Sequence, residues 1–151
     1  MQNTPVINRL DRTRVLESFA DATHPRMRRV SRSLACGDTP AHIGRLLLRM
    51  QQAQPINPTL VPCDMVTMNS IVRLIDLDTL QLHRVALVYD AECAHETPAG
   101  VEPVEIQEEL GSELLARCVG DTIIIAQRSH TTRLRIDAIE YQPEHAGDYD
   151  R

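Results

Sequence analysis

A proline-rich segment at residues 54–62 divides the sequence into two parts with different hydrophobic periodicity. Pro55, Pro58 and Pro62 fall within eight residues, and each proline removes a backbone donor and restricts the residue before it. Apolar residues recur at helical spacing before this segment and alternate after it. The sequence therefore predicts a helical part with a stiff linker, residues 1–62, followed by a strand-rich part, residues 63–151.

Two helices are predicted in the first part, with a shorter helical segment between them. Asp11 is the expected N-cap of a helix over Arg12–Ala22. A second helix is predicted over Pro40–Ala53. Apolar residues before it also recur at helical spacing up to Gly37, and a glycine suits the C-terminus of a helix. The first ten residues are expected to be loosely structured. Together these segments predict a short antiparallel helical hairpin.

The second part predicts an antiparallel, one-sided sheet that packs on one short helix. Ser70–Leu77, Leu80–Tyr89 and Thr132–Tyr141 alternate in hydrophobicity, as half-buried strands do. Glu108–Arg117 has the spacing of a short helix. Gly120 then provides a tight turn, because it tolerates positive φ, and Thr122–Ala126 follows as a β-branched run that we expect to be a buried strand. The predicted fold class is α+β.

The composition excludes several kinds of protein. No apolar run approaches the length of about 20 residues that a membrane span needs, and we expect a cytoplasmic protein. Aromatic residues make up 3% of the chain and Trp is absent, so neither base-stacking platforms nor the aromatic pocket of a prolyl isomerase is expected. The four cysteines form no CxxC pair, and Cys93-Ala-His95 lacks a second half of a metal site. We expect free thiols, no metal and no cofactor.

Charge is distributed unevenly between the two parts. Residues 1–62 hold nine Arg and four acidic residues, whereas residues 63–151 hold seven Arg and seventeen acidic residues. The most basic stretch lies between the two predicted helices and contains Arg26, Arg28, Arg29 and Arg32. These arginines predict either a contact with phosphate or with an acidic partner, or a solvated helix face that pairs with the acidic part of the same chain.

Several short motifs resemble those of one known family. The segment Val66-Thr67-Met68-Asn69-Ser70 opens the sheet part, and Leu114-Leu115 precedes Val119-Gly120-Asp121. The chain closes on Glu140-Tyr141-Gln142-Pro143-Glu144, with Ala146-Gly147-Asp148-Tyr149 shortly after. In this order the motifs resemble the Rnk branch of the GreA/GreB transcript-cleavage-factor family, from about Asp64 to Tyr149.

The resemblance implies a C-terminal domain of FKBP-like topology after an N-terminal helical hairpin. It also implies that the sheet domain docks at the secondary channel of RNA polymerase. Members of the family place a Ser-Pro before the docking helix, whereas this chain has Glu108 and Glu109, followed by Leu110 and Gly111. These four residues are the candidate polymerase contact, and Arg26, Arg28, Arg29 and Arg32 are the candidate basic tip contact.

Transcript cleavage is not expected, because it needs two neighbouring carboxylates to hold a catalytic Mg²⁺. The predicted tip offers Asp38, with Asp21 before it and four arginines between them. We therefore predict a non-enzymatic, monomeric regulator that binds RNA polymerase and competes with Gre-type factors. It would contact RNA or DNA phosphates only within that complex. The alternative is an interaction module that regulates another cytoplasmic enzyme, such as nucleoside diphosphate kinase.

Overall fold

The structure, a computed structural model, describes residues 5–21, 23–24, 27–92, 97–126 and 128–148. Three helices occupy the first third of the chain: α1 (Arg9–Ala20), α2 (Arg28–Cys36) and α3 (Ala41–Gln52). Gly37 ends α2 with a φ of 75°, as predicted. The predicted N-cap of α1 is wrong: Asn8 caps this helix by accepting a hydrogen bond from the Leu10 amide at 2.9 Å. Asp11 is instead buried inside the first turn.

Both ends of the helical part form strands that the sequence did not indicate. β1 (Val6–Asn8) pairs in parallel with β2 (Gln54–Ile56), where the sequence predicts a loose start and a linker. The Gln54 amide donates to the Pro5 carbonyl at 2.9 Å, and Ile7 is buried. A short 3₁₀ helix, η1 (Pro58–Leu60), follows with Asn57 as its cap. Pairing between segments this distant leaves no local pattern in the sequence.

The main sheet has five strands in the order β5-β4-β3-β7-β6. β3 and β4 form a hairpin, and β7 pairs antiparallel with both β3 and β6. The strands span Ile71–Asp76, Leu82–Val88, Glu102–Glu105, Thr122–Ala126 and Thr131–Tyr141 for β3 to β7. The prediction of an antiparallel sheet is wrong at one edge, since β5 runs parallel to β4. The long connection after β4 carries the chain back, which parallel pairing requires.

The helix α4 (Glu109–Leu114) is shorter than predicted, because Leu115 is extended and Ala116 adopts a positive φ of 65°. Gly120 has the expected positive φ, at 95°. The strand β6 begins where the sequence predicts, but it is not a fully buried strand. It lies at the sheet edge, and its side chains are alternately exposed and buried. The polar tail also contains a short helix, α5 (Pro143–Ala146).

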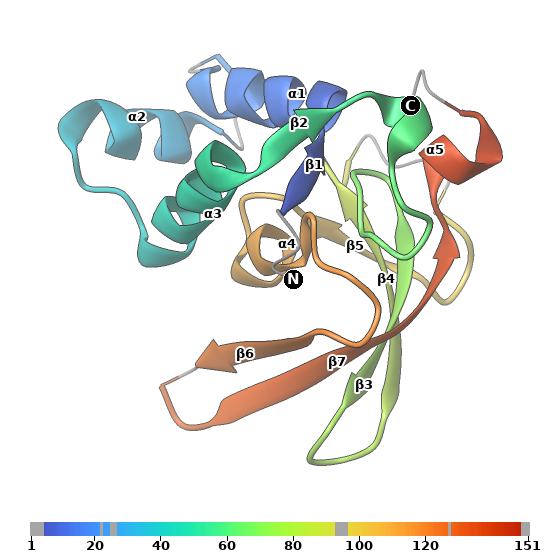
Figure 1. Ribbon diagram of the computed structural model, residues 1–151. Coiled ribbons are helices and arrows are strands. Elements are labelled where there is room, and N and C mark those ends of the chain that lie inside the picture. Colours follow the sequence, from blue (N-terminus) through green and yellow to red (C-terminus); the bar gives the residue numbers. More distant parts are fainter. Residues whose placement is uncertain (1–4, 22, 25–26, 93–96, 127, 149–151) are drawn as a thin grey trace.

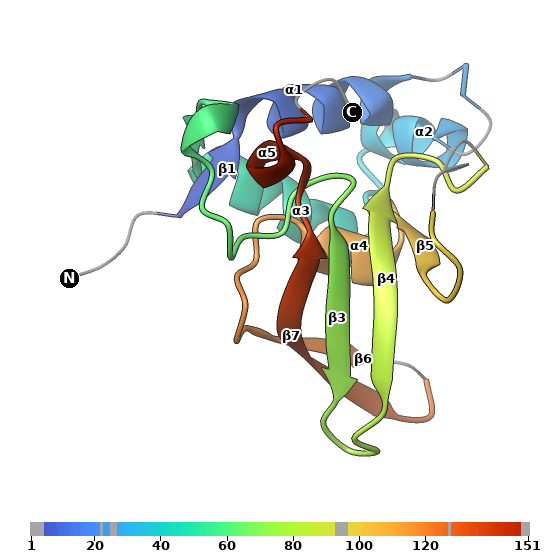
Figure 2. The same cartoon turned by 90° about the vertical axis from the view of Figure 1, so that its right-hand side faces the viewer.

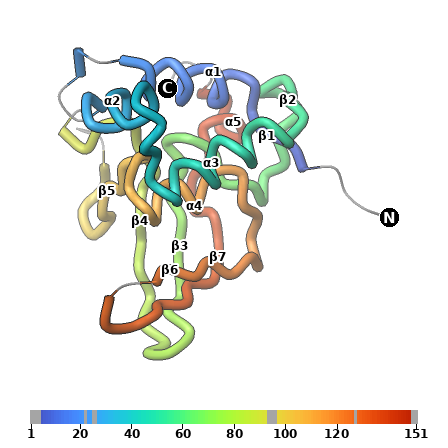
Figure 3. Tube along the Cα trace, turned by 90° about the vertical axis from the view of Figure 1, so that its left-hand side faces the viewer, coloured from blue at the N-terminus to red at the C-terminus, as the bar shows by residue number. Residues whose placement is uncertain are grey.

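The helices α1–α3 gather at one end of the sheet, and the hairpins β3–β4 and β6–β7 extend from the other end (Figures 1 and 2). Figure 3 shows α3 next to α4, which packs on the sheet. Buried apolar residues from the helices and the sheet form one connected core. It includes Phe19, Met27, Ile43, Val72, Leu74 and Leu87. The helical part therefore shares its core with the sheet.

Candidate functional site

A groove of about 790 Å³ separates α2 and α3 at the end of the molecule. Arg29 and Arg32 line it from α2, and His42 lines it from α3. Gln107, which directly precedes the predicted contact at Glu108, lines it from the sheet part. The His42 Nε2 atom lies 2.9 Å from the Gln107 carbonyl oxygen. The structure thus brings the basic segment and the approach to α4 to the same groove, although they are far apart in the sequence.

The arginines of α2 are exposed because the apolar residues of this helix take the opposite face. Met27 and Val30 are buried in the core, and Leu34 packs against it. Arg28, Arg29 and Arg32 are exposed. No ion-pair partner is found for these three among the residues that the structure describes. One interpretation of the sequence expected these arginines to pair with the acidic part of the chain, but no such pair occurs between described residues. Arg26 lies outside the described residues.

The four residues of the candidate polymerase contact differ in accessibility. Glu108 is exposed and precedes α4, whereas Glu109 and Leu110 are half-buried in its first turn. Gly111 is buried, and a Cβ added there would lie 2.0 Å from the Glu105 carbonyl oxygen. Glycine at this position allows α4 to approach the end of β5 closely. Glu108 is thus the most accessible residue of this segment.

A cluster of charged side chains links α3 to α4. The Glu113 carboxylate accepts hydrogen bonds from Arg45 Nε at 2.9 Å and from Arg117 at 3.1 Å. Arg49 donates to the Ser112 and Leu115 carbonyls at 2.7 and 2.9 Å, where α4 ends. Burial alone would raise the pKa of Glu113, but the Arg45 hydrogen bond and the charges of Arg49 and Arg117 outweigh it, so the pKa is lowered. Burial lowers the pKa of Arg49 to about 10, and both groups remain charged at neutral pH.

A second polar cluster joins the two sequence motifs to α1. Glu144, from the closing motif, accepts hydrogen bonds from Asn8 Nδ2 at 2.6 Å and from Thr67 Oγ1 at 2.7 Å. Asp11 accepts a hydrogen bond from the Met68 amide at 3.0 Å. Sequence reasoning missed this cluster, because its members are separated by 57 to 136 positions. The motifs therefore serve to hold α1 against the sheet part.

Burial raises the pKa of the Asp11 carboxyl group well above that of an exposed aspartate. Loss of solvation and the nearby charge of Glu144 raise its pKa, while the Met68 amide and Arg14 lower it. Burial is the largest contribution, and the pKa is raised to about 7. The same surroundings raise the pKa of Tyr89. This carboxyl group therefore titrates near neutral pH inside the junction between α1 and the sheet.

Asp38 of the predicted tip and Asp21 before it lie beyond opposite ends of α2. Asp21 accepts hydrogen bonds from the backbone and hydroxyl of Thr23, at 2.9 and 2.6 Å. Asp38 lines the groove beyond the other end of α2. In the described part of the chain, no group of three or more metal-ligating side chains occurs. Cys93 and His95 lie outside it, and the other three cysteines are free.

The fold is that of a prokaryotic transcription elongation factor of the GreA/GreB type. A solved structure of such a factor from Nitrosomonas europaea matches with a TM-score of 0.64 and 23% sequence identity. The match covers 93% of this chain and all of that one. No family model matches the chain. In the described residues, no helix combines the length and apolar character needed to cross a bilayer.

Sequence similarity identifies the branch. The chain is 33% identical over 118 residues to the regulator of nucleoside diphosphate kinase from Escherichia coli K12, and the match covers 74% of this chain and 84% of that protein. The protein of that name from Shigella flexneri matches equally. The chain belongs to this Rnk-like branch of the GreA/GreB family, whose members are named as regulators or transcription factors.

Proposed function

We propose that the protein binds RNA polymerase near its secondary channel, without stimulating transcript cleavage, and thereby competes with Gre-type factors. Its GreA/GreB-type fold supports this proposal, and the groove beside α2 is the observation that carries it. Arg29 and Arg32, which have no ion-pair partner among the described residues, line this groove together with Gln107, shortly before α4. A basic surface of this kind suits phosphate or an acidic protein surface, since guanidinium groups form bidentate pairs with both.

The finer architecture belongs to the same proposal. We regard residues 1–62 as a shortened form of the helical hairpin and residues 63–151 as an FKBP-like domain. The exposed Glu108 and half-buried Glu109 would replace the Ser-Pro of the family as the polymerase contact. The arginines of α2 would approach RNA or DNA phosphates within the complex. The protein would act in the cytoplasm as a monomer and would need no cofactor.

A competition experiment tests polymerase binding. Labelled protein is titrated with purified RNA polymerase at low salt, and then with unlabelled Gre-type factor. We expect saturable binding that the competitor reverses. The triple variant Arg28→Ala, Arg29→Ala, Arg32→Ala should bind more weakly and with a shallower salt dependence. Arg9→Ala is the matched control, because Arg9 is also exposed but belongs to α1. Absence of binding at low salt would reject the proposal.

A cleavage assay tests the second half of the proposal. A stalled elongation complex with Mg²⁺ is incubated with this protein or with a cleavage-competent Gre factor. We expect no cleavage above the polymerase's own rate, because Asp21 bonds to Thr23 and basic α2 intervenes before Asp38. A divalent cation is repelled by such a surface. Stimulated cleavage that Asp38→Asn abolishes would contradict this part.

A further inference from the structure

The strand β6 is an edge of the main sheet and leaves one row of side chains open to solvent. Ile123 and Ile125 are buried beneath the sheet, whereas Thr122, Ile124 and Ala126 are exposed. Ile124 is 61% exposed. In the strand order, β6 and β5 are the two opposite edges of the sheet, and Figure 1 shows β6 alongside β7.

The backbone of β6 is also open on this side. The Gly120 amide donates to the Ile136 carbonyl at 2.8 Å, and the Ile136 amide donates to Asp121 at 2.9 Å, which is the pattern of a bulge that begins with glycine. From this bulge, antiparallel alternation directs the amides and carbonyls of Ile123 and Ile125 towards β7. The backbone groups of Ile124 therefore point away from β7, and within the described residues no other strand pairs with β6.

Natural sheets protect such edges, and this one is not protected. Charged side chains, proline or a covering segment normally prevent a second chain from pairing with an open strand. The opposite edge, β5, contains exposed Glu102 and a proline, Pro103. The sequence of β6 is Thr-Ile-Ile-Ile-Ala, without charge or proline. An uncharged open edge of this kind is a template for strand addition.

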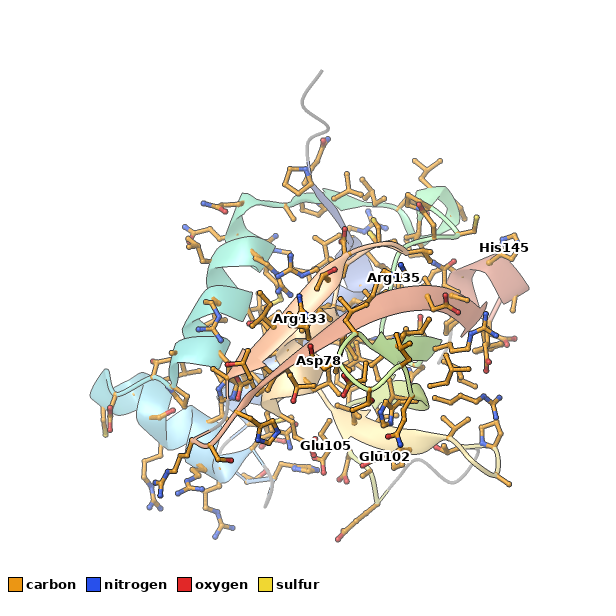
Figure 4. The ribbon with its side chains drawn as sticks, turned by 90° about the horizontal axis from the view of Figure 1, so that it is seen from below. Asp78, Glu102, Glu105, Arg133, Arg135 and His145 are labelled. Atoms are coloured by element: carbon orange, nitrogen blue, oxygen red, sulfur yellow. The ribbon has the colours of Figure 1, made fainter. Side chains whose placement is uncertain are left out.

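Two arginines lie on the same face as Ile124. Arg133 is the direct cross-strand partner of Ile124, and Arg135 is that of Thr122. Both are exposed: Arg133 pairs with the exposed Asp78 at 2.8 Å, and Arg135 lies 3.8 Å from Asp137. Figure 4 shows both arginines along β7, with Asp78 beside Arg133. A carboxylate on a strand added beyond β6 would compete with Asp78 and Asp137 for these guanidinium groups, and exposed ion pairs of this kind are weak.

We propose that β6 is a docking edge for an extended, acidic segment of a partner protein, which adds to the sheet as a sixth strand. Backbone hydrogen bonds to Ile124 would provide the affinity, and carboxylates near Arg133 and Arg135 would provide selectivity. A second copy of this chain fits less well, because its β6 is uncharged and would offer no carboxylate to Arg133 and Arg135. This surface is separate from the groove beside α2, so the inference does not depend on polymerase binding.

Peptide binding tests the proposal with defined probes. A fluorescein-labelled octapeptide of alternating Glu and Val is titrated with the full-length protein, and fluorescence anisotropy is recorded. An octapeptide of alternating Lys and Val has similar strand propensity and serves as the control. We expect the acidic peptide to bind at least tenfold more tightly, with an affinity that falls as salt increases. Equal binding of both peptides, or no binding of either, would overturn the proposal.

Variants of β6 separate strand addition from simple charge attraction. Ile124→Pro removes the outward amide, and proline is tolerated where an edge amide faces solvent. Ile124→Lys keeps the amide and adds a charge that protects the edge. We expect each variant to weaken binding of the acidic peptide at least tenfold. The matched control Leu82→Lys alters a residue that is equally exposed, at 59%, but lies on β4, away from β6. It should change nothing.

Two further measurements identify the occupant. Bound peptide should slow amide hydrogen exchange within residues 122–126 of the wild-type protein. In the double variant Arg133→Ala, Arg135→Ala, the preference for the acidic peptide over the basic peptide should be lost. Light scattering over a range of concentrations reports self-association. A dimer that Ile124→Lys dissociates would overturn the assignment to an acidic partner. Exchange that the peptide leaves unchanged would overturn strand addition.

Discussion

Single side chains at the junction of α1, α3 and α4 with the sheet have chemical environments far from those of free residues. Asp11 is held in a buried position by one backbone hydrogen bond, and Gly111 touches the backbone of a neighbouring strand. Neither residue is a helix cap or part of a reverse turn between elements. Their roles follow from what the fold places beside them, and each gives a measurable consequence.

The titration of Asp11 should make stability depend on pH. Its folded pKa of about 7 exceeds the ordinary value of 3.8 for an aspartate. The contribution of Asp11 to stability is therefore complete below pH 4 and is lost as pH rises through 7. The loss is on the order of 4 kcal/mol at most. Asp11→Asn preserves the acceptor for the Met68 amide without the charge. The variant should therefore be the more stable protein at pH 8, and the two should converge near pH 4.

Urea unfolding at several pH values measures this difference. Subtracting the wild-type curve from that of the variant removes the contributions of other titrating groups. A difference that stays constant between pH 4 and pH 8 would show that the Asp11 carboxyl does not titrate in this range.

Replacing Gly111 should destabilise the protein strongly. In Gly111→Ala the new methyl group would approach the Glu105 carbonyl to 2.0 Å, so α4 must move away from β5. Overpacking of this kind costs about 1–3 kcal/mol or more. Gly44→Ala is the control, because Gly44 lies in α3 with nothing within 4 Å of an added Cβ. That change should stabilise by roughly 0.5–1 kcal/mol. Urea denaturation of both variants provides the comparison.

At the scale of elements, the ion cluster around Glu113 links α3 to α4. Glu113 is 8% exposed and has three arginine neighbours. Partial exposure of Arg45 and Arg117 reduces its contribution below that of a fully buried pair. The cluster therefore links the helical part to the sheet part, and its removal should reduce the stability of both parts.

Glu113→Gln should destabilise the protein by about 2 kcal/mol, since the half-buried Arg49 loses its counter-charge. Asp78→Asn provides the comparison, because its pair with Arg133 is exposed on both sides and should contribute at most about 1 kcal/mol. Chemical denaturation at low and high salt distinguishes the two, with the larger effect at Glu113. Equal effects at both sites would mean that burial of the Glu113 cluster has no energetic consequence.

At the scale of the whole molecule, the main hydrophobic core joins the helices to the sheet. Phe19 and Ile43 belong to the same cluster as Val72 and Leu134. The strands β1 and β2 and the cluster around Glu144 add polar links across the same junction. The helical part therefore has little buried apolar surface that is independent of the sheet.

This arrangement predicts one cooperative unfolding transition. Far-ultraviolet circular dichroism, which is dominated by helices, should follow the same thermal curve as calorimetry of the whole chain. Excision of residues 1–62 should yield a fragment without stable helix, because its apolar faces lose their partners. Two separated transitions, or a folded fragment, would indicate that the helical part is stable by itself.

Local features of the sequence predicted a substantial part of this fold. The helix α3, the turn at Gly120 and the strands β3, β4, β6 and β7 follow from periodicity and turn chemistry within short windows. The α+β class and the family also followed from local motifs. The parallel pairs β1–β2 and β4–β5 did not, because strand pairing depends on segments that the sequence does not mark as neighbours.

The candidate site shows the same division. Basic character of α2 and acidic character before α4 can be read directly from the residues, since charge is a local property. The meeting of α2 with Gln107 at one groove, the titration of Asp11 and the close contact at Gly111 arise from long-range packing. The segment Thr122–Ala126 is the clearest case. Its strand propensity is intrinsic to β-branched residues, but only the position of β6 at the sheet edge decides that Ile124 faces solvent.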